Sequence, residues 1–231
     1  MATAIILAGG LGTRLRSVVS DVPKPMAPIN NKKPFLDYLM SYWARKGITK
    51  FKLSVGYRHQ IIIDYFGSDF SGVPVEYVIE NVPLGTGGGF LKSIQNEKGN
   101  VIVLNGDTFF DVDISSLKQA HIDNDSAWTI ATFSSEDSSR YKGIKLERNG
   151  QVLSFDSQST CSQVNGGVYI VNREKIEFLY SEYTLGCKIS LEDDLLHSVL
   201  ERKKLYGVRQ AGVFVDIGVP EDYQKSKMIL K

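Results

Sequence analysis

Short apolar runs and stretches of helical spacing alternate through the first half of the chain. The pattern predicts strands at residues 3–8, 51–55, 75–79 and 101–104, and helices at residues 34–46, 58–66 and 87–95. Such alternation with short connections is typical of a parallel sheet covered by helices on both faces. The sequence therefore predicts an α/β fold.

The second half of the chain is richer in predicted strands. These are expected at residues 127–133, 143–147, 151–155, 164–171 and 213–217, and helices at residues 173–180, at 190–203 and after Pro220. Turns such as Asn149-Gly150 separate the strands. Because no repeat, low-complexity tract or linker interrupts the chain, one continuous domain over residues 1–231 is favoured over two.

Composition excludes several classes of partner. The formal net charge of +1 gives no bulk field to attract nucleic acid or an anionic membrane. Cys161 and Cys187 form no metal or disulfide pattern, which favours a reducing cytoplasm. The N-terminal apolar run is one strand long and lacks a basic lead, so neither a signal peptide nor a membrane anchor is expected. His59, His121 and His197 lack metal-ligand spacing and are expected at the surface or at helix edges.

A glycine-rich turn, Leu7 to Leu15, follows the first predicted strand. It matches neither the phosphate loop of NTPases nor the dinucleotide fingerprint, because Leu15 stands where the third glycine belongs. The consecutive amides from Leu11 to Arg14 could form an anion nest, with Arg14 as a charged donor. The alternative is a tight turn with a surface arginine.

Two further segments favour an anion site. In Pro23-Lys24-Pro25-Met26 the two prolines stiffen the backbone and present Lys24 with little conformational freedom to lose, although such a loop can be purely structural. A second glycine cluster, at residues 81–89, lies at a strand-to-helix junction directly after Glu80, where a flat ligand could approach the backbone.

With these segments the chain resembles the sugar-1-phosphate nucleotidylyltransferases. The motifs are Leu7-Ala8-Gly9-Gly10-Leu11-Gly12-Thr13-Arg14-Leu15, the Pro-Lys-Pro segment, Pro83-Leu84-Gly85-Thr86-Gly87-Gly88, Asn105-Gly106-Asp107, Asn165-Gly166-Gly167-Val168-Tyr169 and Val215-Asp216-Ile217-Gly218. Within the family, the set is most similar to that of the D-glycero-α-D-manno-heptose 1-phosphate guanylyltransferases. The resemblance implies a Rossmann-like mixed, mostly parallel sheet with a smaller β-rich part. It also implies a nucleotide-binding half (residues 1–112) and a sugar-phosphate-binding half (residues 113–231).

The resemblance implies in-line attack of a sugar phosphate oxygen on the α-phosphorus of a nucleoside triphosphate. Both reactants are anions, so catalysis is mainly charge neutralisation and positioning. Arg14, Lys24 and Asp107 are the expected catalytic residues, with Arg14 on the β- and γ-phosphates and Lys24 nearer the α-phosphate. Asp107 and Asp216, each just after an apolar run, are the expected ligands of Mg²⁺, although each could instead cap a turn. Asp111 and Asp113 are alternatives, expected to face solvent or cap a helix.

The implied nucleotide site is the first glycine-rich turn and the second glycine cluster. Its residues are Leu7, Ala8, Gly9, Gly10, Gly12, Thr13, Arg14, Glu80, Pro83, Gly85 and Thr86. A carboxylate at Glu80 can accept two donors from the guanine edge, which favours GTP. Some uridylyl-transferring relatives also carry an acid at this position, so both nucleotides stay open.

The implied sugar-phosphate site draws mainly on the second half. Its residues are Lys24, Asn105, Gly106, Gly143, Asn165, Gly166 and Glu192. Glu192 has a structural alternative, since Ser190 and Asp193 form an acceptable capping box. Relatives commonly carry a Glu-Lys pair whose lysine contacts the sugar phosphate, but the corresponding stretch here reads Phe155-Asp156-Ser157-Gln158. Either Lys24 and another basic group suffice, or the loop 156–163 is rearranged.

The expected function is guanylyl transfer from GTP to a sugar 1-phosphate, with D-glycero-α-D-manno-heptose 1-phosphate favoured, for bacterial surface glycans. The expected products are GDP-sugar and pyrophosphate. Mannose 1-phosphate with GTP, or N-acetylmuramate 1-phosphate with UTP, are near alternatives. A catalytically silent regulator that binds nucleotide sugars is the alternative of another class. Because relatives are often oligomeric, a homo-oligomer is also expected.

Overall fold

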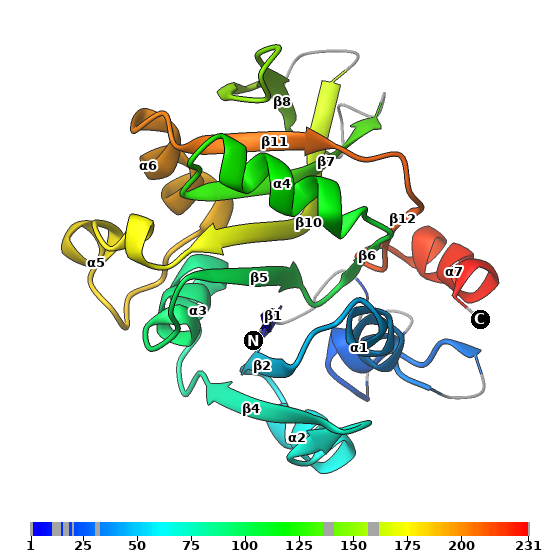
Figure 1. The fold of residues 1–231 in the computed structure, drawn as a ribbon. Coiled ribbons are helices and arrows are strands. Elements are labelled where there is room, and N and C mark those ends of the chain that lie inside the picture. Colours follow the sequence, from blue (N-terminus) through cyan, green and yellow to red (C-terminus); the bar gives the residue numbers. More distant parts are fainter. Residues whose placement is uncertain are drawn as a thin grey trace.

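The structure is a computed structural model that describes residues 2–10, 15, 19, 21–30, 33–135, 141–156 and 162–230. Its centre is a mixed sheet with the strand order β11-β7-β10-β5-β1-β2-β4-β3, shown in Figure 1. The strands β1 (Thr3–Ala8), β2 (Lys50–Val55), β4 (Val73–Ile79) and β5 (Asn100–Asn105) run parallel, and Ile6 pairs with Leu53 on one side and Leu104 on the other. The short strand β3 (Asp69–Phe70) lies antiparallel at the edge. The predicted parallel α/β sheet is confirmed.

The β-rich second half extends this same sheet. The strand β10 (Ser162–Asn172) lies antiparallel between β5 and β7 (Trp128–Ser135), and β11 (Leu205–Arg209) runs parallel to β7 at the far edge. The hairpin of β8 (Gly143–Leu146) and β9 (Val152–Asp156) branches from β10. Because β10 pairs directly with β5, both halves of the chain share one sheet.

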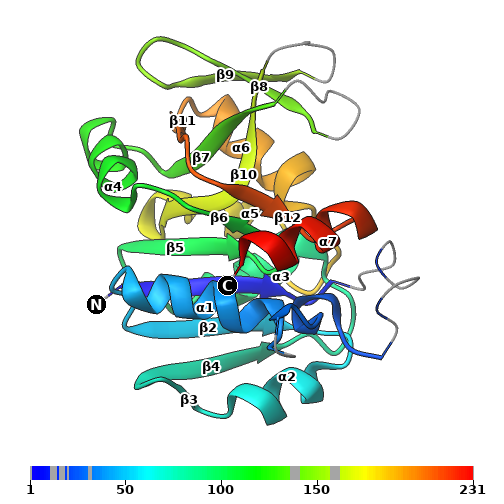
Figure 2. The ribbon, with the colours of Figure 1, turned by 90° about the vertical axis from the view of Figure 1, so that its right-hand side faces the viewer.

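Helices cover both faces of the sheet, as Figure 2 shows. They are α1 (Phe35–Arg45), α2 (His59–Phe66), α3 (Gly85–Ile94), α4 (Ile114–Asp123), α5 (Leu179–Glu182), α6 (Leu196–Glu201) and α7 (Pro220–Ile229). Apolar residues of α1, α2, α4 and α7 join one core cluster, and those of α3, α5 and α6 join the other. Ala4, Ile6 and Ala8 of β1 belong to the first cluster and Ile5 to the second. Burial on both faces explains why β1 is apolar from Ala4 to Ala8.

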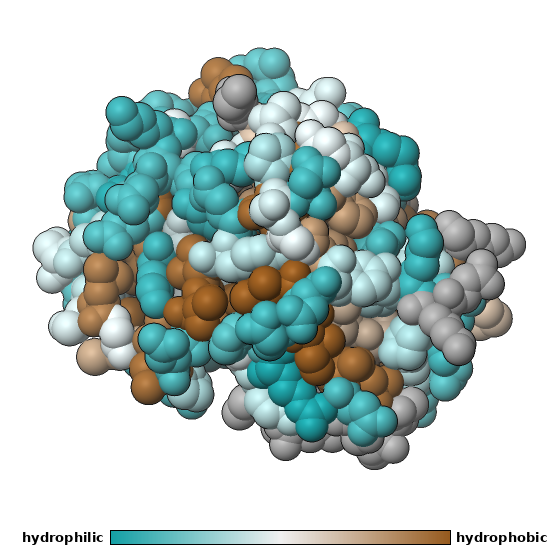
Figure 3. All heavy atoms as spheres, turned by 90° about the horizontal axis from the view of Figure 1, so that it is seen from below, coloured by the Kyte–Doolittle hydropathy of each residue, from teal (hydrophilic) through white to brown (hydrophobic). Residues whose placement is uncertain are grey.

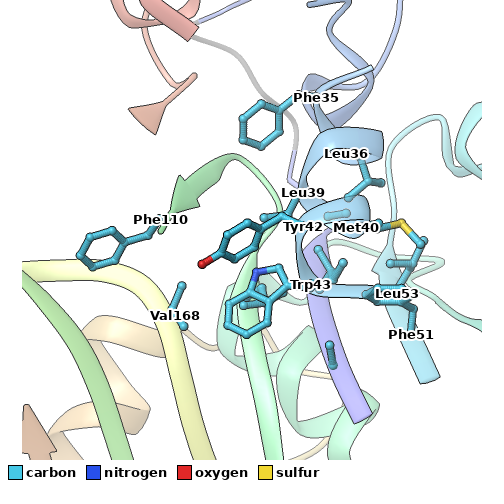
Figure 4. Close-up of a cluster of buried hydrophobic side chains, with 14 of the residues drawn as sticks. Phe35, Leu36, Leu39, Met40, Tyr42, Trp43, Phe51, Leu53, Phe110 and Val168 are labelled. Carbon is cyan, nitrogen blue, oxygen red and sulfur yellow. The ribbon is translucent and has the colours of Figure 1, made fainter. Parts of the chain in front are cut away.

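Figure 4 shows the part of the first cluster where α1 packs on the sheet. The helix begins at Phe35, one residue after the predicted start at Pro34, and places its apolar stripe on β2. The packed side chains are Phe35, Leu36, Leu39, Met40 and Trp43 of α1 and Phe51 and Leu53 of β2. This packing fixes the segment that precedes α1, which carries Lys24.

Several elements differ from the prediction. The helix expected at residues 190–203 begins as a π-helical turn, η5 (Leu191–Leu195), and continues as α6. The helix expected at 173–180 is divided into a 3-10 turn, η4 (Glu174–Ile176), and α5. The helix α4 was not predicted, because only Leu117 and His121 of its residues are buried and the apolar pattern is weak.

A small second sheet connects the C-terminal region to the end of β5. It consists of β6 (Thr108–Phe110) and β12 (Phe214–Asp216), with Thr108 opposite Asp216. The backbone NH of Ile217 also donates to the carbonyl of Asp107 at 3.0 Å. Two motifs about a hundred residues apart are thereby brought to the same place.

The face seen from below in Figure 1, where β4 and α2 lie, carries a band of hydrophobic residues among hydrophilic ones (Figure 3). No helix among the described residues is both long enough and apolar enough to span a bilayer.

Candidate active site

A cavity of about 570 Å³ opens where the parallel strands end. Ala8 of β1, Ser54 of β2, Glu80 after β4 and Asn105 of β5 all line it, so it lies at the carboxyl edge of the sheet. Ligands of open α/β sheets bind at this edge. The full lining is Leu7, Ala8, Gly9, Gly10, Lys24, Pro25, Ser54, Glu80, Pro83, Gly85, Thr86, Gly89, Asn105, Gly106, Asp107, Tyr169, Lys188, Ser190, Leu191, Glu192 and Gly218.

Lys24 links the two aspartates that the sequence singles out. Its Nζ lies 2.6 Å from Asp107 Oδ2 and 3.9 Å from Asp216 Oδ1. The lysine begins a 3-10 turn, η2 (Lys24–Met26), in which Pro25 and Met26 are buried, and the preceding Pro23 is extended. The prolines therefore fix the backbone on both sides of a side chain that is itself largely buried.

The donor set at this point suits a divalent cation. Two carboxylates approach one point from neighbouring elements, and hard oxygen ligands of this kind are those that Mg²⁺ prefers. Gly218 is needed for the arrangement, because a Cβ there would lie 2.6 Å from Asp216 Oδ1 and 3.0 Å from Lys24 Nζ. The backbone NH of Gly218 donates to Asp216 Oδ1 at 2.6 Å and holds that carboxylate in place.

Asp111 and Asp113 lie outside the cavity. Asp111 accepts a hydrogen bond from the Tyr42 hydroxyl at 2.8 Å and lies 3.8 Å from Lys46. Asp113 caps α4, where its carboxylate accepts from the backbone of Ser115 and Ser116. The expectation that Asp113 caps a helix agrees with this geometry.

Glu80 is held in a narrow slot. Its carboxylate accepts from Ser54 Oγ at 3.0 Å and from the backbone NH of Leu84 at 3.2 Å. A Cβ at Gly9 would overlap Glu80 Oε1, and one at Gly89 would lie 2.6 Å from the same atom. The glycines on both sides therefore make room for the carboxylate and leave its orientation little freedom.

The second glycine cluster approaches protein backbone as well as the cavity. A Cβ at Gly85 would overlap the carbonyl of Ile189, one at Gly87 would lie 2.8 Å from Ser190, and one at Gly88 would lie 3.0 Å from the Cys187 carbonyl. The interpretation from sequence, a surface kept bare for a flat ligand, covers only part of this role. Gly85 and Gly89 line the cavity, whereas Gly87 and Gly88 are small so that residues 187–190 can pack on α3.

Glu192 belongs to a polar group at the other end of the lining. Asn165 Nδ2 donates to Glu192 Oε1 at 2.9 Å and to the Tyr169 hydroxyl at 2.7 Å. Burial raises the pKa of the Glu192 carboxyl and, more strongly, that of the Tyr169 hydroxyl. The capping alternative is also realised nearby, because Ser190 Oγ accepts from the backbone NH of Asp193 at 3.0 Å.

Most of the described site residues predicted from the sequence line the cavity. Those that do not are Gly143, Asn165, Gly166 and Asp216. Asp216 contacts Lys24, and Asn165 contacts Glu192, and both contacted residues line the cavity. Gly143 is buried in β8, and a Cβ at Gly166 would overlap the Phe110 ring. Gly12, Thr13, Arg14 and the stretch 157–158 lie outside the described residues.

The cavity-lining residues that were not predicted as site residues include Ser54, Tyr169 and Lys188. Ser54 is a polar residue near the end of a buried strand, and this could have marked it. Tyr169 is fully buried and looks like a core aromatic in sequence. Lys188 lies in no periodic pattern, so nothing in the sequence marked it.

A family model described as nucleotidyl transferase matches residues 3–231, and the chain belongs to that family. The expected family, enzyme class and fold are thereby confirmed.

Two relatives are similar over nearly their whole length. The chain is 42% identical over 231 residues to the D-glycero-α-D-manno-heptose 1-phosphate guanylyltransferase of Aneurinibacillus thermoaerophilus, which covers 99% of this chain and 98% of the relative. It is 40% identical over 222 residues to the enzyme of that name in Campylobacter jejuni, and the match covers 95% of this chain and 96% of the relative. The crystal structure of HddC from Yersinia pseudotuberculosis complexed with GMP-PN superposes with a TM-score of 0.83 at 35% identity, over the full length of both chains.

Proposed function

We propose that the protein transfers a guanylyl group from GTP to D-glycero-α-D-manno-heptose 1-phosphate, with GDP-heptose and pyrophosphate as products. The observation that carries the proposal is the meeting of Lys24, Asp107 and Asp216 at a cavity that also contains Glu80. The names of the two relatives that match nearly the whole chain support the choice of nucleotide and sugar.

The residues of the cavity fit an in-line displacement at the α-phosphorus. Lys24 supplies positive charge where the two phosphates approach each other, and its backbone is fixed before substrate binds. Asp107 and Asp216 would hold Mg²⁺, which when bound neutralises phosphate charge and orients the α-phosphate. Arg14 is proposed to bind the β- and γ-phosphates that leave as pyrophosphate.

The nucleotide base is proposed to lie beside Glu80. A carboxylate held by Ser54 and Leu84 presents its remaining lone pairs in a fixed direction, and guanine offers two adjacent donors to it. Leu7 to Gly10, with Gly12, Thr13, Pro83, Gly85 and Thr86, are proposed to surround the nucleotide.

The sugar is proposed to lie toward Glu192. Asn165 holds the Glu192 carboxylate where it can accept sugar hydroxyls, and Asn105 and Gly106 continue the lining toward Asp107. Gly143 and Gly166 support this side from behind the lining. We further propose that the enzyme works in the cytoplasm, supplies bacterial surface glycans and forms a homo-oligomer, which sedimentation of the purified chain tests.

The deciding experiment measures pyrophosphate release by the purified protein with each nucleoside triphosphate and a panel of sugar 1-phosphates. Turnover should be highest with GTP and D-glycero-α-D-manno-heptose 1-phosphate, and chelation of divalent cations should abolish it. Preference for mannose 1-phosphate, or for UTP with N-acetylmuramate 1-phosphate, would replace the proposed substrates. Tight binding of a GDP-sugar without any turnover would replace the enzyme by a regulatory homologue.

A further inference from the structure

Lys188 lines the active-site cavity with its charge uncompensated. Among the residues that the structure describes, its ammonium group takes part in no ion pair and no hydrogen bond. The other lysine in the lining, Lys24, is paired with Asp107, and nearby Lys142 lies 2.5 Å from Asp193. A cation beside a cavity without a protein partner is available to an anionic ligand.

The backbone that directly follows Lys188 is fixed. The NH of Ile189 donates to the Leu84 carbonyl at 2.8 Å, and the Ile189 carbonyl accepts from Gly87 at 2.9 Å. Thr86 Oγ1 accepts from the NH of Leu191 at 3.1 Å. The Ile189 side chain is buried in the second core cluster, so its neighbour Lys188 stays at the cavity. This attachment gives the lysine a defined position although its side chain is exposed.

Among the described residues of the lining, acidic side chains outnumber basic ones, and Lys188 offsets part of this negative charge. Glu80, Asp107 and Glu192 contribute carboxylates, and the charge of Lys24 is already balanced by aspartates. Two phosphorylated substrates add further negative charge, and among the described basic residues of the lining Lys188 is the one that no carboxylate pairs. The stretch Phe155-Asp156-Ser157-Gln158, where the sequence resemblance leads one to expect a lysine for this purpose, contains none.

Lys188 lies along the chain between the two parts of the lining. Its neighbour Ile189 is bonded to Leu84 and Gly87 of the glycine cluster proposed for the nucleotide. Ser190 and Glu192, two and four residues after Lys188, line the cavity on the side proposed for the sugar. Lys188 is therefore placed where the nucleotide and the sugar phosphate would meet.

We propose that the Lys188 ammonium group binds the phosphate of the acceptor sugar 1-phosphate and takes over the role of the absent lysine. The proposal rests on the proposed function, because it assumes a sugar 1-phosphate as acceptor. Lys188 is a binding residue in this proposal, and the reaction at the α-phosphorus is left to Lys24 and its neighbours.

The test compares Lys188→Gln and Lys188→Arg with the wild type in steady-state kinetics. The matched control is Lys118→Gln, which removes an exposed lysine of α4 away from the cavity. In Lys188→Gln the KM for the sugar 1-phosphate should rise about 10- to 100-fold, the effect of losing one charge-assisted hydrogen bond, while the KM for GTP changes less than about twofold. Lys188→Arg should recover most of the loss, and Lys118→Gln should match the wild type.

The outcomes separate this inference from the proposed function. If the wild type turns over no sugar 1-phosphate, the proposed function fails and the inference fails with it. If the wild type is active and Lys188→Gln keeps its KM for the acceptor, only the inference is overturned. A rise in the KM for GTP alone also overturns it, because Lys188 then binds the nucleotide. Isothermal titration with the sugar 1-phosphate alone should show the same loss of affinity without turnover.

Discussion

Lys24 Nζ and Asp107 Oδ2 lie 2.6 Å apart at the carboxyl edge of the central sheet. Asp216 Oδ1 lies 3.9 Å from the same nitrogen, although Asp107 comes after β5 and Asp216 ends β12, in different parts of the chain. The lysine therefore holds two carboxylates close together, and the three groups together carry a net negative charge. Such a site can bind a divalent cation between the carboxylates while the Lys24 ammonium group contacts a phosphate of the substrate.

Replacement of Lys24 should separate its role in neutralising phosphate charge from its role in pairing with the two aspartates. In Lys24→Gln, turnover should fall about 10²- to 10³-fold, because one fixed cation is lost from the transition state. Affinity for Mn²⁺, used as a probe for the divalent site, should not fall, since both carboxylates remain and lose their internal cation. Turnover is measured by pyrophosphate release and Mn²⁺ binding by electron paramagnetic resonance. Turnover within about threefold of the wild type would contradict a role for Lys24 at the phosphates.

Replacement of either aspartate should weaken the cation site. Asp107→Asn and Asp216→Asn should each lower turnover at least about 10²-fold and weaken Mn²⁺ binding in the absence of nucleotide. Asp111→Asn is the matched control, because Asp111 contacts Tyr42 and Lys46 outside the cavity. It should bind Mn²⁺ normally and cost about 1 kcal/mol in unfolding free energy. Normal Mn²⁺ affinity in both Asp107→Asn and Asp216→Asn would show that the cation binds elsewhere.

Glu80 should govern the choice of base. In Glu80→Gln, one of the two side-chain acceptors that face the guanine donors is replaced by an NH2 donor, so kcat/KM for GTP should fall about 10- to 100-fold. The relative rate with UTP should rise. Gly9→Ala is a second approach, since its Cβ would overlap Glu80 Oε1 and displace the carboxylate without removing it. Rates are compared with GTP and UTP under the same conditions, and an unchanged ratio in both variants would place the base elsewhere.

Much of the fold could be predicted from the sequence because its central strands carry a strong apolar signal. The runs that became β1 and β5 are buried and show as continuous apolar stretches at residues 4–8 and 101–104. In β2 lysines alternate with apolar residues, and β4 is only partly buried, but both still have apolar residues at alternate positions. The short edge strand β11 and the weakly apolar α4 lack that signal, and neither was predicted. The insertion of β10, antiparallel, between β5 and β7 depends on long-range pairing, which local patterns do not encode.

In the candidate site, too, local sequence predicted some features, whereas others depend on long-range contacts. Glu80 directly follows β4, Asp107 lies two residues after β5 and Asp216 ends β12, so sequence position predicted an approach to the cavity edge. Their actual neighbours depend on tertiary contacts, such as the β6–β12 pairing that brings Asp216 to Asp107. Lys188 reaches the cavity only because residues 187–190 pack on the glycines of α3.

The histidines were expected at the surface or at helix edges, and for His121 this is wrong. Its side chain is buried between α4 and the sheet, where Nδ1 contacts Thr129 Oγ1 at 2.8 Å and Nε2 contacts Asn100 Oδ1 at 3.3 Å. Burial, assisted by the positive charge of Lys175, lowers the pKa of His121 from about 6.5 to about 4. The folded protein therefore keeps the ring neutral at a pH where the unfolded chain is protonated.

This pKa difference should make stability depend on pH in a predictable direction. Because the folded pKa lies below the unfolded one, the contribution of His121 is complete above pH 6.5 and is lost as the pH falls toward 4. The loss is about 3 kcal/mol in unfolding free energy between these limits. In His121→Gln this part of the acid sensitivity should be absent, although the variant is less stable than the wild type at neutral pH.

Urea unfolding of the wild type and of His121→Gln between pH 4 and 8 checks the prediction. Carboxylates such as that of Glu97, whose pKa is lowered by hydrogen bonds from Lys52 and Lys50 despite the opposing effect of burial, add to the acid sensitivity of both proteins. The difference between the two unfolding free energies removes that shared background. It should be constant above pH 7 and shrink steadily below pH 6.5, since only the wild type has a buried imidazole to protonate. A difference that stays constant down to pH 4.5 would mean that His121 titrates alike in the folded and unfolded chains.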